Sequence, residues 1–171
     1  RSLDGGLTWP IDHIQLPGCT DAEFLGFSAE NYSIDARGNT VVIVGGGAET
    51  DMVMWKSTDN GDTWTRTTLF AYPMGPLYDE AAAISDVDGD GTADTLTVTG
   101  QDVTVSLDNN NVAHVAVGGI REINDGNPSL AMGYFFGDEG IWYWNENNPT
   151  WTVVAAVEDL STPPDGIITL P

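Results

Sequence analysis

An internal repeat constrains the fold of this chain more than any other feature of its sequence. The segment SIDARGNTVVIVGG at 33–46 lies over SLDNNNVAHVAVGG at 106–119 without a gap. The two copies share a serine, an aspartate, apolar strand positions and a closing Gly-Gly. Further along, MWKSTDNGDTWT at 54–65 corresponds to YWNENNPTWT at 143–152, with a connection two residues shorter. The unit therefore predicts two strands joined by a turn, a Gly-Gly loop, and two tryptophan-bearing strands joined by a second turn.

Short apolar or alternating runs extend this pattern, and Gly, Asn, Asp and Pro separate them. Val, Thr, Ile, Trp and Tyr dominate the runs, which is typical of strands. Only residues 79–84 are compatible with a helix, and that Ala-rich stretch is too short to be stable by itself. The predicted fold class is therefore all-β. The runs lie at 40–44, 52–55, 64–69, 96–99, 112–117, 141–144 and 151–157.

Two units of four antiparallel strands predict a partial β-propeller, because each propeller blade buries its faces only against its neighbours. A blade takes about 40–50 residues, so the spacing between the two copies implies an insertion. Two blades cannot close a ring of at least about four, so we expect missing sequence or another chain to supply the remainder. The expected parts of this one propeller are the end of a blade (1–16), a blade (31–69), the insertion (70–101), a second blade (102–158) and the start of a next blade or a linker (159–171).

Two segments share the pattern S-x-D-x-G-x-T-W, RSLDGGLTW at 1–9 and KSTDNGDTW at 56–64. The pattern predicts a hairpin turn in which the aspartate accepts hydrogen bonds from turn N–H groups, the glycine supplies a positive φ and the serine ties the entering strand. The tryptophan is expected to pack between blades. A degenerate copy at 145–151 has lost the Asp-x-Gly pair, so a different turn is expected there. The motif residues are Ser2, Asp4, Gly6 and Trp9 in the first copy and Ser57, Asp59, Gly61 and Trp64 in the second.

These turns resemble the Asp-box, or BNR, repeats of the sialidase-like and sortilin-like β-propellers. The resemblance covers about two thirds of the chain. It implies that each Asp box joins the third and fourth strands of a blade, on the rim away from the usual binding face. The Asp-box residues are therefore expected to have a structural role, and the resemblance is more specific for fold than for activity.

A second motif, SDVDGDGTAD at 85–94, spaces its aspartates as D-x-D-x-D-G-x-x-D. Ca²⁺ binds six to eight hard oxygens at about 2.3–2.6 Å, and four carboxylates in one tight loop would otherwise repel one another. Thr97 stands where an EF-hand needs its bidentate Glu, and apolar strand-like runs at 81–84 and 96–98 flank the loop. The predicted Ca²⁺ ligands are Asp86, Asp88, Asp90, the Thr92 carbonyl and Asp94.

The strand context makes this loop similar to the calcium hairpins of integrin-type FG-GAP repeats. The alternative is an acidic turn without an ion. If Ca²⁺ binds, we expect it to make the insertion rigid and to take no part in catalysis, and extracellular Ca²⁺ would saturate even a weak site.

Charge excludes several classes of partner. The chain has 26 Asp and Glu against 5 Lys and Arg, a formal net charge of −21. So few cations exclude nucleic acid binding and disfavour anionic lipid surfaces. No apolar stretch approaches the ~20 residues of a membrane-spanning helix, and the single cysteine, Cys19, allows no internal disulfide. Since the sequence begins at Arg1 inside a repeat, we interpret it as a processed or partial chain.

The resemblance implies a test for catalysis, because a sialidase binds the substrate carboxylate with three arginines beside a Tyr–Glu pair. Of the four arginines, Arg1 lies in an Asp box, Arg37 in a hairpin turn and Arg66 on a fourth strand. Only Arg121, after a Gly-Gly pair, is expected near a pocket. We therefore assign no catalytic residue.

The expected function is that of a non-catalytic, Ca²⁺-stabilised scaffold that binds glycan or protein ligands through loops between blades. We expect it in a secreted or cell-surface protein, bacterial in origin. The alternative is part of a sialidase-type exo-glycoside hydrolase, which convergence of the arginines on one pocket would favour. A third candidate is a purely structural subunit of a surface assembly.

Overall fold

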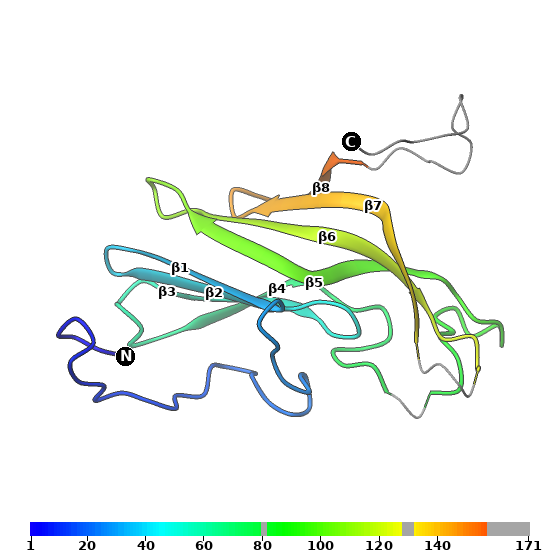
Figure 1. Cartoon of the computed structure of the whole chain (residues 1–171), viewed down its shortest axis with the longest axis horizontal. Helices are drawn as coiled ribbons and strands as arrows, with labels where there is room; N and C mark the ends of the chain where they lie inside the picture. Colours follow the sequence, from blue (N-terminus) through cyan, green and yellow to red (C-terminus); the bar gives the residue numbers. More distant parts are fainter. Residues whose placement is uncertain (80–81, 128–131, 157–171) are drawn as a thin grey trace, which may run out of the picture.

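The computed structural model describes residues 1–79, 82–127 and 132–156. Every regular element in these ranges is a β-strand, which confirms the all-β class. The strands form two antiparallel sheets of four, in which neighbours in sequence are neighbours in the sheet (Figure 1). The described part of the chain contains no helix able to cross a membrane. The first sheet contains β1 (Tyr32–Arg37), β2 (Thr40–Gly46), β3 (Met52–Ser57) and β4 (Thr65–Phe70), and the second contains β5 (Leu96–Leu107), β6 (Ala113–Ile123), β7 (Gly133–Asn145) and β8 (Asn148–Ala155).

Each apolar run found in the sequence overlaps one strand. The described residues of the stretch at 79–84 form no helix, as expected for so short an Ala-rich run, but the strand-like run expected at 81–84 does not form a strand in its described residues either. Residues 96–101, expected in the insertion, belong to β5, which pairs with β6 on both sides of an irregularity. The inserted segment in the structure is therefore 71–95, and the expected part at 159–171 lies outside the described residues.

The repeat is visible in the central strands of the two sheets. β2 and β6 alternate between buried and half-buried positions in the same order through their first five residues. Val42 and Val115, which the repeat aligns, are both fully buried. The hairpins differ, since two residues connect β1 to β2 whereas five connect β5 to β6.

Two tryptophans that the repeat aligns, Trp55 and Trp144, lie on opposite faces of their sheets. Trp55 pairs with Ile43, whereas Trp144 pairs with Val115, the equivalent of Val42. Because side chains alternate along a strand, a difference of one residue in pairing turns a side chain to the other face. Trp144 therefore lies in the core between the sheets, and Trp55 lies in a separate cluster on the outer face of the first sheet.

The two sheets pack face to face as two layers, with the largest hydrophobic core between them (Figure 1). Trp151 of β8 packs against this core and donates its indole N–H to the Leu69 carbonyl of β4 at 2.8 Å. The buried members are Val42, Val44, Met52, Met54, Leu69, Val105, Leu107, Ala113, Val115, Val117 and Trp144.

Side-chain hydrogen bonds join the facing edges of β1 and β5. The Val105 N–H donates to Ser33 Oγ at 3.1 Å, and the Leu107 N–H donates to Asp35 Oδ2 at 2.7 Å. Ser33 and Asp35 are the serine and aspartate of the first repeat copy. Edge-strand N–H groups need partners when they are shielded from water, so these bonds fix the sheets to each other along one edge.

The N-terminal segment covers the outer face of the first sheet, the face that points away from the second. The rings of Phe24 and Trp55 lie 5.8 Å apart between centroids, and the Trp55 indole N–H donates to the Pro17 carbonyl at 2.7 Å. Trp64, which was expected to pack between blades, is half-buried against this cluster and does not lie between the two sheets, where its repeat equivalent Trp151 lies.

The expectation that Trp9 packs between blades is wrong, because its side chain is 64% exposed. Residues 1–31 contain no strand, so the turn that carries Trp9 has no neighbouring sheet surface to bury it. The segment 1–16 thus contains the S-x-D-x-G-x-T-W turn but no strand.

Candidate functional site

The two Asp-box turns have the same hydrogen bonds. In the second box, Ser57 Oγ donates to Asp59 Oδ1 at 2.8 Å, and the Gly61 N–H donates to Ser57 Oγ at 2.8 Å. Thr63 donates to the Asp59 carboxylate through its N–H at 2.8 Å and its hydroxyl at 2.6 Å. Ser2, Asp4, Gly6 and Thr8 repeat these bonds at 2.7–2.9 Å. Gly6 and Gly61 have φ of 91° and 85°, so the predicted roles of serine, aspartate and glycine are confirmed.

The threonine of each box has a role that the sequence analysis did not predict. The Thr8 and Thr63 hydroxyls are the main reason that the pKa values of Asp4 and Asp59 fall to about 2, and the threonine N–H groups add to the effect. Both carboxylates therefore stay ionised and bound to their turns far into acid. The expected different turn in the degenerate copy is confirmed: Asn145 Oδ1 accepts the N–H groups of Asn147 and Asn148, each at 3.0 Å.

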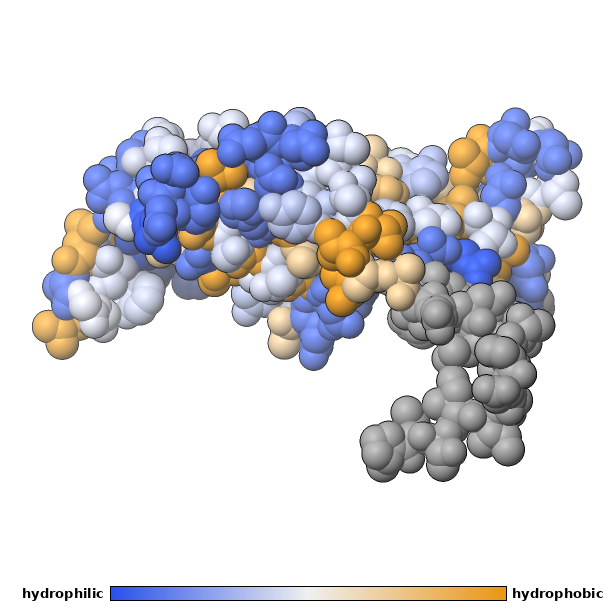
Figure 2. Space-filling model, turned by 90° about the horizontal axis from the view of Figure 1, so that it is seen from above, coloured by the Kyte–Doolittle hydropathy of each residue, from blue (hydrophilic) through white to orange (hydrophobic). Residues whose placement is uncertain are grey.

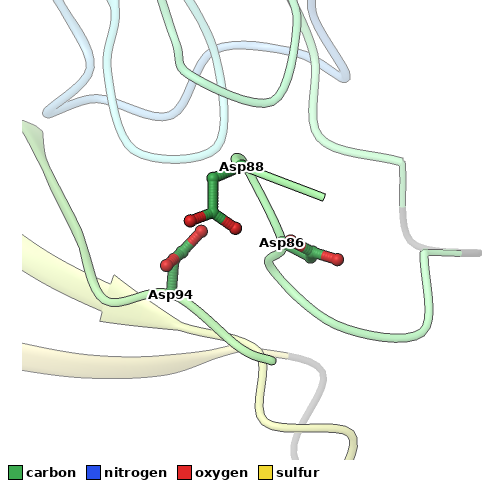
Figure 3. A group of neighbouring side chains, drawn as sticks. All are labelled: Asp86, Asp88 and Asp94. Atoms are coloured by element: carbon green, nitrogen blue, oxygen red, sulfur yellow. The ribbon is translucent and has the colours of Figure 1, made fainter. Parts of the chain in front are cut away.

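Three of the predicted calcium ligands come together in the acidic loop. Asp86, Asp88 and Asp94 each offer a carboxylate oxygen within 4.8 Å of the other two. Figure 3 shows the carboxylates of Asp88 and Asp94 facing each other. Two oxygens bound to one Ca²⁺ at about 2.3–2.6 Å are at most about 5 Å apart, so the trio fits a single ion.

Asp90, another predicted ligand, is not part of this trio. Asp90 Oδ1 accepts both the N–H and the hydroxyl of Thr92, at 2.7 and 2.5 Å, and the hydroxyl is the main cause that lowers the pKa of Asp90. Asp86 also orders the loop, because its carboxylate accepts the N–H groups of Gly89 and Gly91 at 2.7 and 2.9 Å.

The base of the acidic loop is anchored to the second sheet. Ser85 Oγ donates to the Asp94 carbonyl at 2.6 Å, and the Asp94 N–H donates to the Ser85 carbonyl at 2.5 Å. The Ser85 N–H donates to the Asn124 carbonyl, just after β6, at 3.0 Å. An ion in the loop would therefore stiffen a segment that is attached directly to the sheet.

A cavity of about 310 Å³ opens where the Gly-Gly ends of the two sheets meet. None of its lining residues is a lysine or an arginine. The three arginines considered for catalysis do not converge there: Arg66 pairs with Glu23, Arg121 lies 3.4 Å from Glu139, and Arg37 lines a separate depression. The cavity is lined by Glu30, Ala48, Gly100, Gln101, Asp102, Gly118, Ile120 and Tyr134.

Glu122 was not predicted as a site residue, yet it is the most unusual acidic side chain in the described structure. It has no exposed surface, and neither carboxylate oxygen has a hydrogen-bond partner. Burial raises the pKa of Glu122 to about 7, and the charge of Glu49 adds to the rise against an opposing effect of the Tyr72 hydroxyl. The only sequence signal is a charged residue within the apolar run that ends β6, and such a residue usually points to solvent.

Comparison with known proteins adds no relative from which a role could be carried over. No protein-family model, no curated protein and no solved structure matches the chain. The repeat, the two S-x-D-x-G-x-T-W turns, the acidic loop and the cavity are therefore the features that bear on function.

Proposed function

We propose that this chain is part of an Asp-box β-propeller, stabilised by Ca²⁺, that serves as a non-catalytic scaffold for glycan or protein ligands in a secreted or cell-surface protein. The observation that carries the proposal is the pair of repeated four-stranded meanders packed face to face and joined at the edges of their first strands. Propeller blades bury their faces against each other in this way.

The Asp boxes support the blade assignment. The second box lies in the connection between β3 and β4, where the resemblance expects it. The first box lies beside it, because the Arg1 guanidinium contacts Asp62 and the Asn60 carbonyl, each at 2.6 Å. Two neighbouring boxes on one rim are the arrangement expected if residues 1–16 belong to the preceding blade.

The second sheet supports a further blade on its far side. Ser33 and Asp35 bind the free edge of β5, whereas Ser106, the repeat equivalent of Ser33, is exposed. Figure 2, seen from the side on which β7 and β8 lie, shows hydrophobic residues at the surface, and Ile141 and Val154 of these strands are 49% and 58% exposed. A third sheet, from the rest of a longer protein or from another chain, would bury these hydrophobic side chains and donate edge-strand N–H groups to Ser106, as β5 does to Ser33.

The acidic loop supplies the proposed Ca²⁺ site. Asp86, Asp88 and Asp94 provide three hard oxygen donors in reach of one ion, and Asp90 and the Thr92 carbonyl remain candidates to complete the shell. In this role Ca²⁺ offsets carboxylate repulsion and stiffens the insertion beside β6.

The cavity supports binding of a neutral or polyhydroxylated ligand over an anionic one. Its polar lining consists of Glu30, Gln101, Asp102 and Tyr134, without a cationic side chain. A sialidase site needs arginines against the substrate carboxylate, and nothing in the described cavity favours that alternative.

Calcium binding is tested by isothermal titration calorimetry of the wild type and Asp88→Asn. We expect the variant to bind Ca²⁺ at the loop at least about tenfold more weakly, because one ligand charge is lost. Asp12→Asn, which removes an exposed carboxylate elsewhere, is the matched control and should match the wild type. An unchanged isotherm for Asp88→Asn would contradict the loop as the site.

Catalysis is tested with a fluorogenic α-sialoside. We expect no turnover above the protein-free control. Turnover that Arg121→Ala abolishes would contradict the non-catalytic function and support the hydrolase.

A further inference from the structure

The proposed function does not explain why the carboxylate of Glu122 is fully buried without a hydrogen-bond partner. Its carboxylate faces an apolar cluster that includes Tyr72, Leu96 and Ile120. The Tyr72 hydroxyl and the Glu49 backbone N–H approach the carboxylate, but neither satisfies the geometry of a hydrogen bond. The Tyr72 hydroxyl is itself buried without a partner. Buried polar groups nearly always have partners, and an exception indicates an ion, a water molecule or a chemical role.

A second carboxylate, that of Glu49, adds negative charge near Glu122. Burial is the main reason that the pKa values of Glu122, Tyr72 and Tyr134 are raised, and the charge of Glu49 adds to the rise in all three. The Tyr134 hydroxyl donates a hydrogen bond to Glu49 Oε1. No lysine, arginine or histidine contributes to the electrostatics of Glu122 in the described structure. Glu122 is therefore a buried carboxylate with a second, partly exposed carboxylate near it and no cationic side chain that stabilises its charge.

The backbone holds Glu49 in this position at a conformational cost. Ala48 and Glu49 have φ of 39° and 50°, a region that residues with a Cβ rarely adopt. Gly47 before them has φ of 90°, and a Cβ there would collide with the Gly100 carbonyl oxygen of β5. The Ala48 N–H donates to the Thr99 carbonyl and the Tyr78 N–H to the Glu49 carbonyl, both at 2.7 Å. Strain of this kind persists where the surrounding structure fixes it, often at functional sites.

We propose that Glu122 and Glu49 bind a divalent cation, Ca²⁺, between the Tyr72 and Tyr134 hydroxyls, at a site separate from the acidic loop. One divalent ion neutralises both carboxylates, whereas one proton neutralises only one of them. The donors are hard oxygens, which suit Ca²⁺, and water can fill the remaining positions. The same ion would also give the unpartnered oxygens of Glu122 and the Tyr72 hydroxyl a binding partner.

The proposed site lies next to the cavity between the sheets. The cavity between the sheets is lined by Tyr134, by Ala48 next to Glu49, and by Ile120, two residues before Glu122 on β6. Glu30 and Asp102 in the same lining supply negative charge that attracts cations. A Ca²⁺ here would join the β2–β3 loop to β6, and so connect the two sheets.

The test is calorimetric Ca²⁺ stoichiometry in the Asp88→Asn background, titrated at Ca²⁺ concentrations too low to fill the weakened loop site. We expect two ions for the wild type, one for Asp88→Asn and none for Asp88→Asn with Glu122→Gln. The control is Asp88→Asn with Glu30→Gln, which keeps the one ion because Glu30 lies in the cavity lining and is not a proposed ligand. Glutamine matches glutamate in size, and far-UV circular dichroism checks that each variant folds.

Failure of this inference is distinguishable from failure of the loop site. If Asp88→Asn binds no Ca²⁺, or if Glu122→Gln leaves its stoichiometry at one, the inference is overturned. If Asp88→Asn binds as many Ca²⁺ ions as the wild type, the loop is not a Ca²⁺ site. The single substitution Glu122→Gln must then lower the stoichiometry by one ion. Should Glu122→Gln fail to fold, Glu49→Gln, on a half-exposed side chain, must weaken Ca²⁺ binding at least about tenfold, and an unchanged affinity contradicts the site.

Discussion

The two sheets are copies of one pattern, yet the described structure encloses only the first of them on both faces. Phe24 and Pro17 of the N-terminal segment cover Trp55 on the outer face of the first sheet. In the second sheet β8 is exposed along its length except at Trp151, which is half-buried. The repeat therefore determines the face between the sheets, and segments outside the repeat determine what covers the outer faces.

The two Asp-box turns also differ in what surrounds them. The second Asp box connects two strands and places Trp64 against a buried cluster, whereas the first box has no strand beside it and leaves Trp9 exposed. Both boxes nevertheless have the same hydrogen bonds. The motif thus encodes the turn, and the contribution of the tryptophan depends on its surroundings.

The largest effect is expected from the two buried tryptophans that lie on opposite faces. Trp144→Ala and Trp55→Ala should each lower the free energy of unfolding by about 3–5 kcal/mol, because each leaves a large cavity. Only Trp55→Ala should release the N-terminal segment. Urea denaturation measures the first expectation, and limited thermolysin digestion around Phe24 measures the second. Equal cleavage in the two variants would contradict the assignment of the tryptophans to different faces.

A smaller effect should separate the two Asp boxes. Asp59→Ala should lower the Tm by about 3 °C, because the turn it holds sits between two strands of the sheet. Asp4→Ala should lower the Tm by about 1 °C or less, because its turn lies on the surface beside an exposed Trp9. Differential scanning calorimetry of the two variants gives the comparison, and equal shifts would show that the first box is as well integrated as the second.

The smallest effect is a change in titration. Thr63→Val removes the hydroxyl that contributes most to the low pKa of Asp59, so this pKa should rise from about 2 toward 3.8. A lowered pKa stabilises the fold above the ordinary pKa, and that contribution disappears as pH falls through about 2. As pH falls, Thr63→Val should therefore lose this stabilising contribution at a higher pH than the wild type does. Carboxyl-carbon NMR titration follows Asp59, and Asp4, which should remain near 2, is the internal control.

Sequence reasoning succeeds here where a structure is local. The alternation of Val42 and its neighbours predicts β2, and the Ser57, Asp59 and Gly61 spacing predicts the hydrogen bonds of the box. It fails where the outcome depends on distant pairing. A one-residue difference in register moves Trp144 to the inner face. The burial of Glu122 depends on the extension of β5 and β6 beyond the repeat and on the loop that carries Glu49.

The docking of the sheets along β1 and β5 is the feature on which the proposed blade arrangement depends. Amide hydrogen exchange of Val105 and Leu107 tests it most directly, because both N–H groups lie on an edge strand and are covered only if Ser33 and Asp35 bind them. We predict slow exchange at both amides in the wild type, and at least about tenfold faster exchange of Leu107 in Asp35→Ala. Exchange of these two amides in the wild type at the rate of exposed edge residues would contradict the docking.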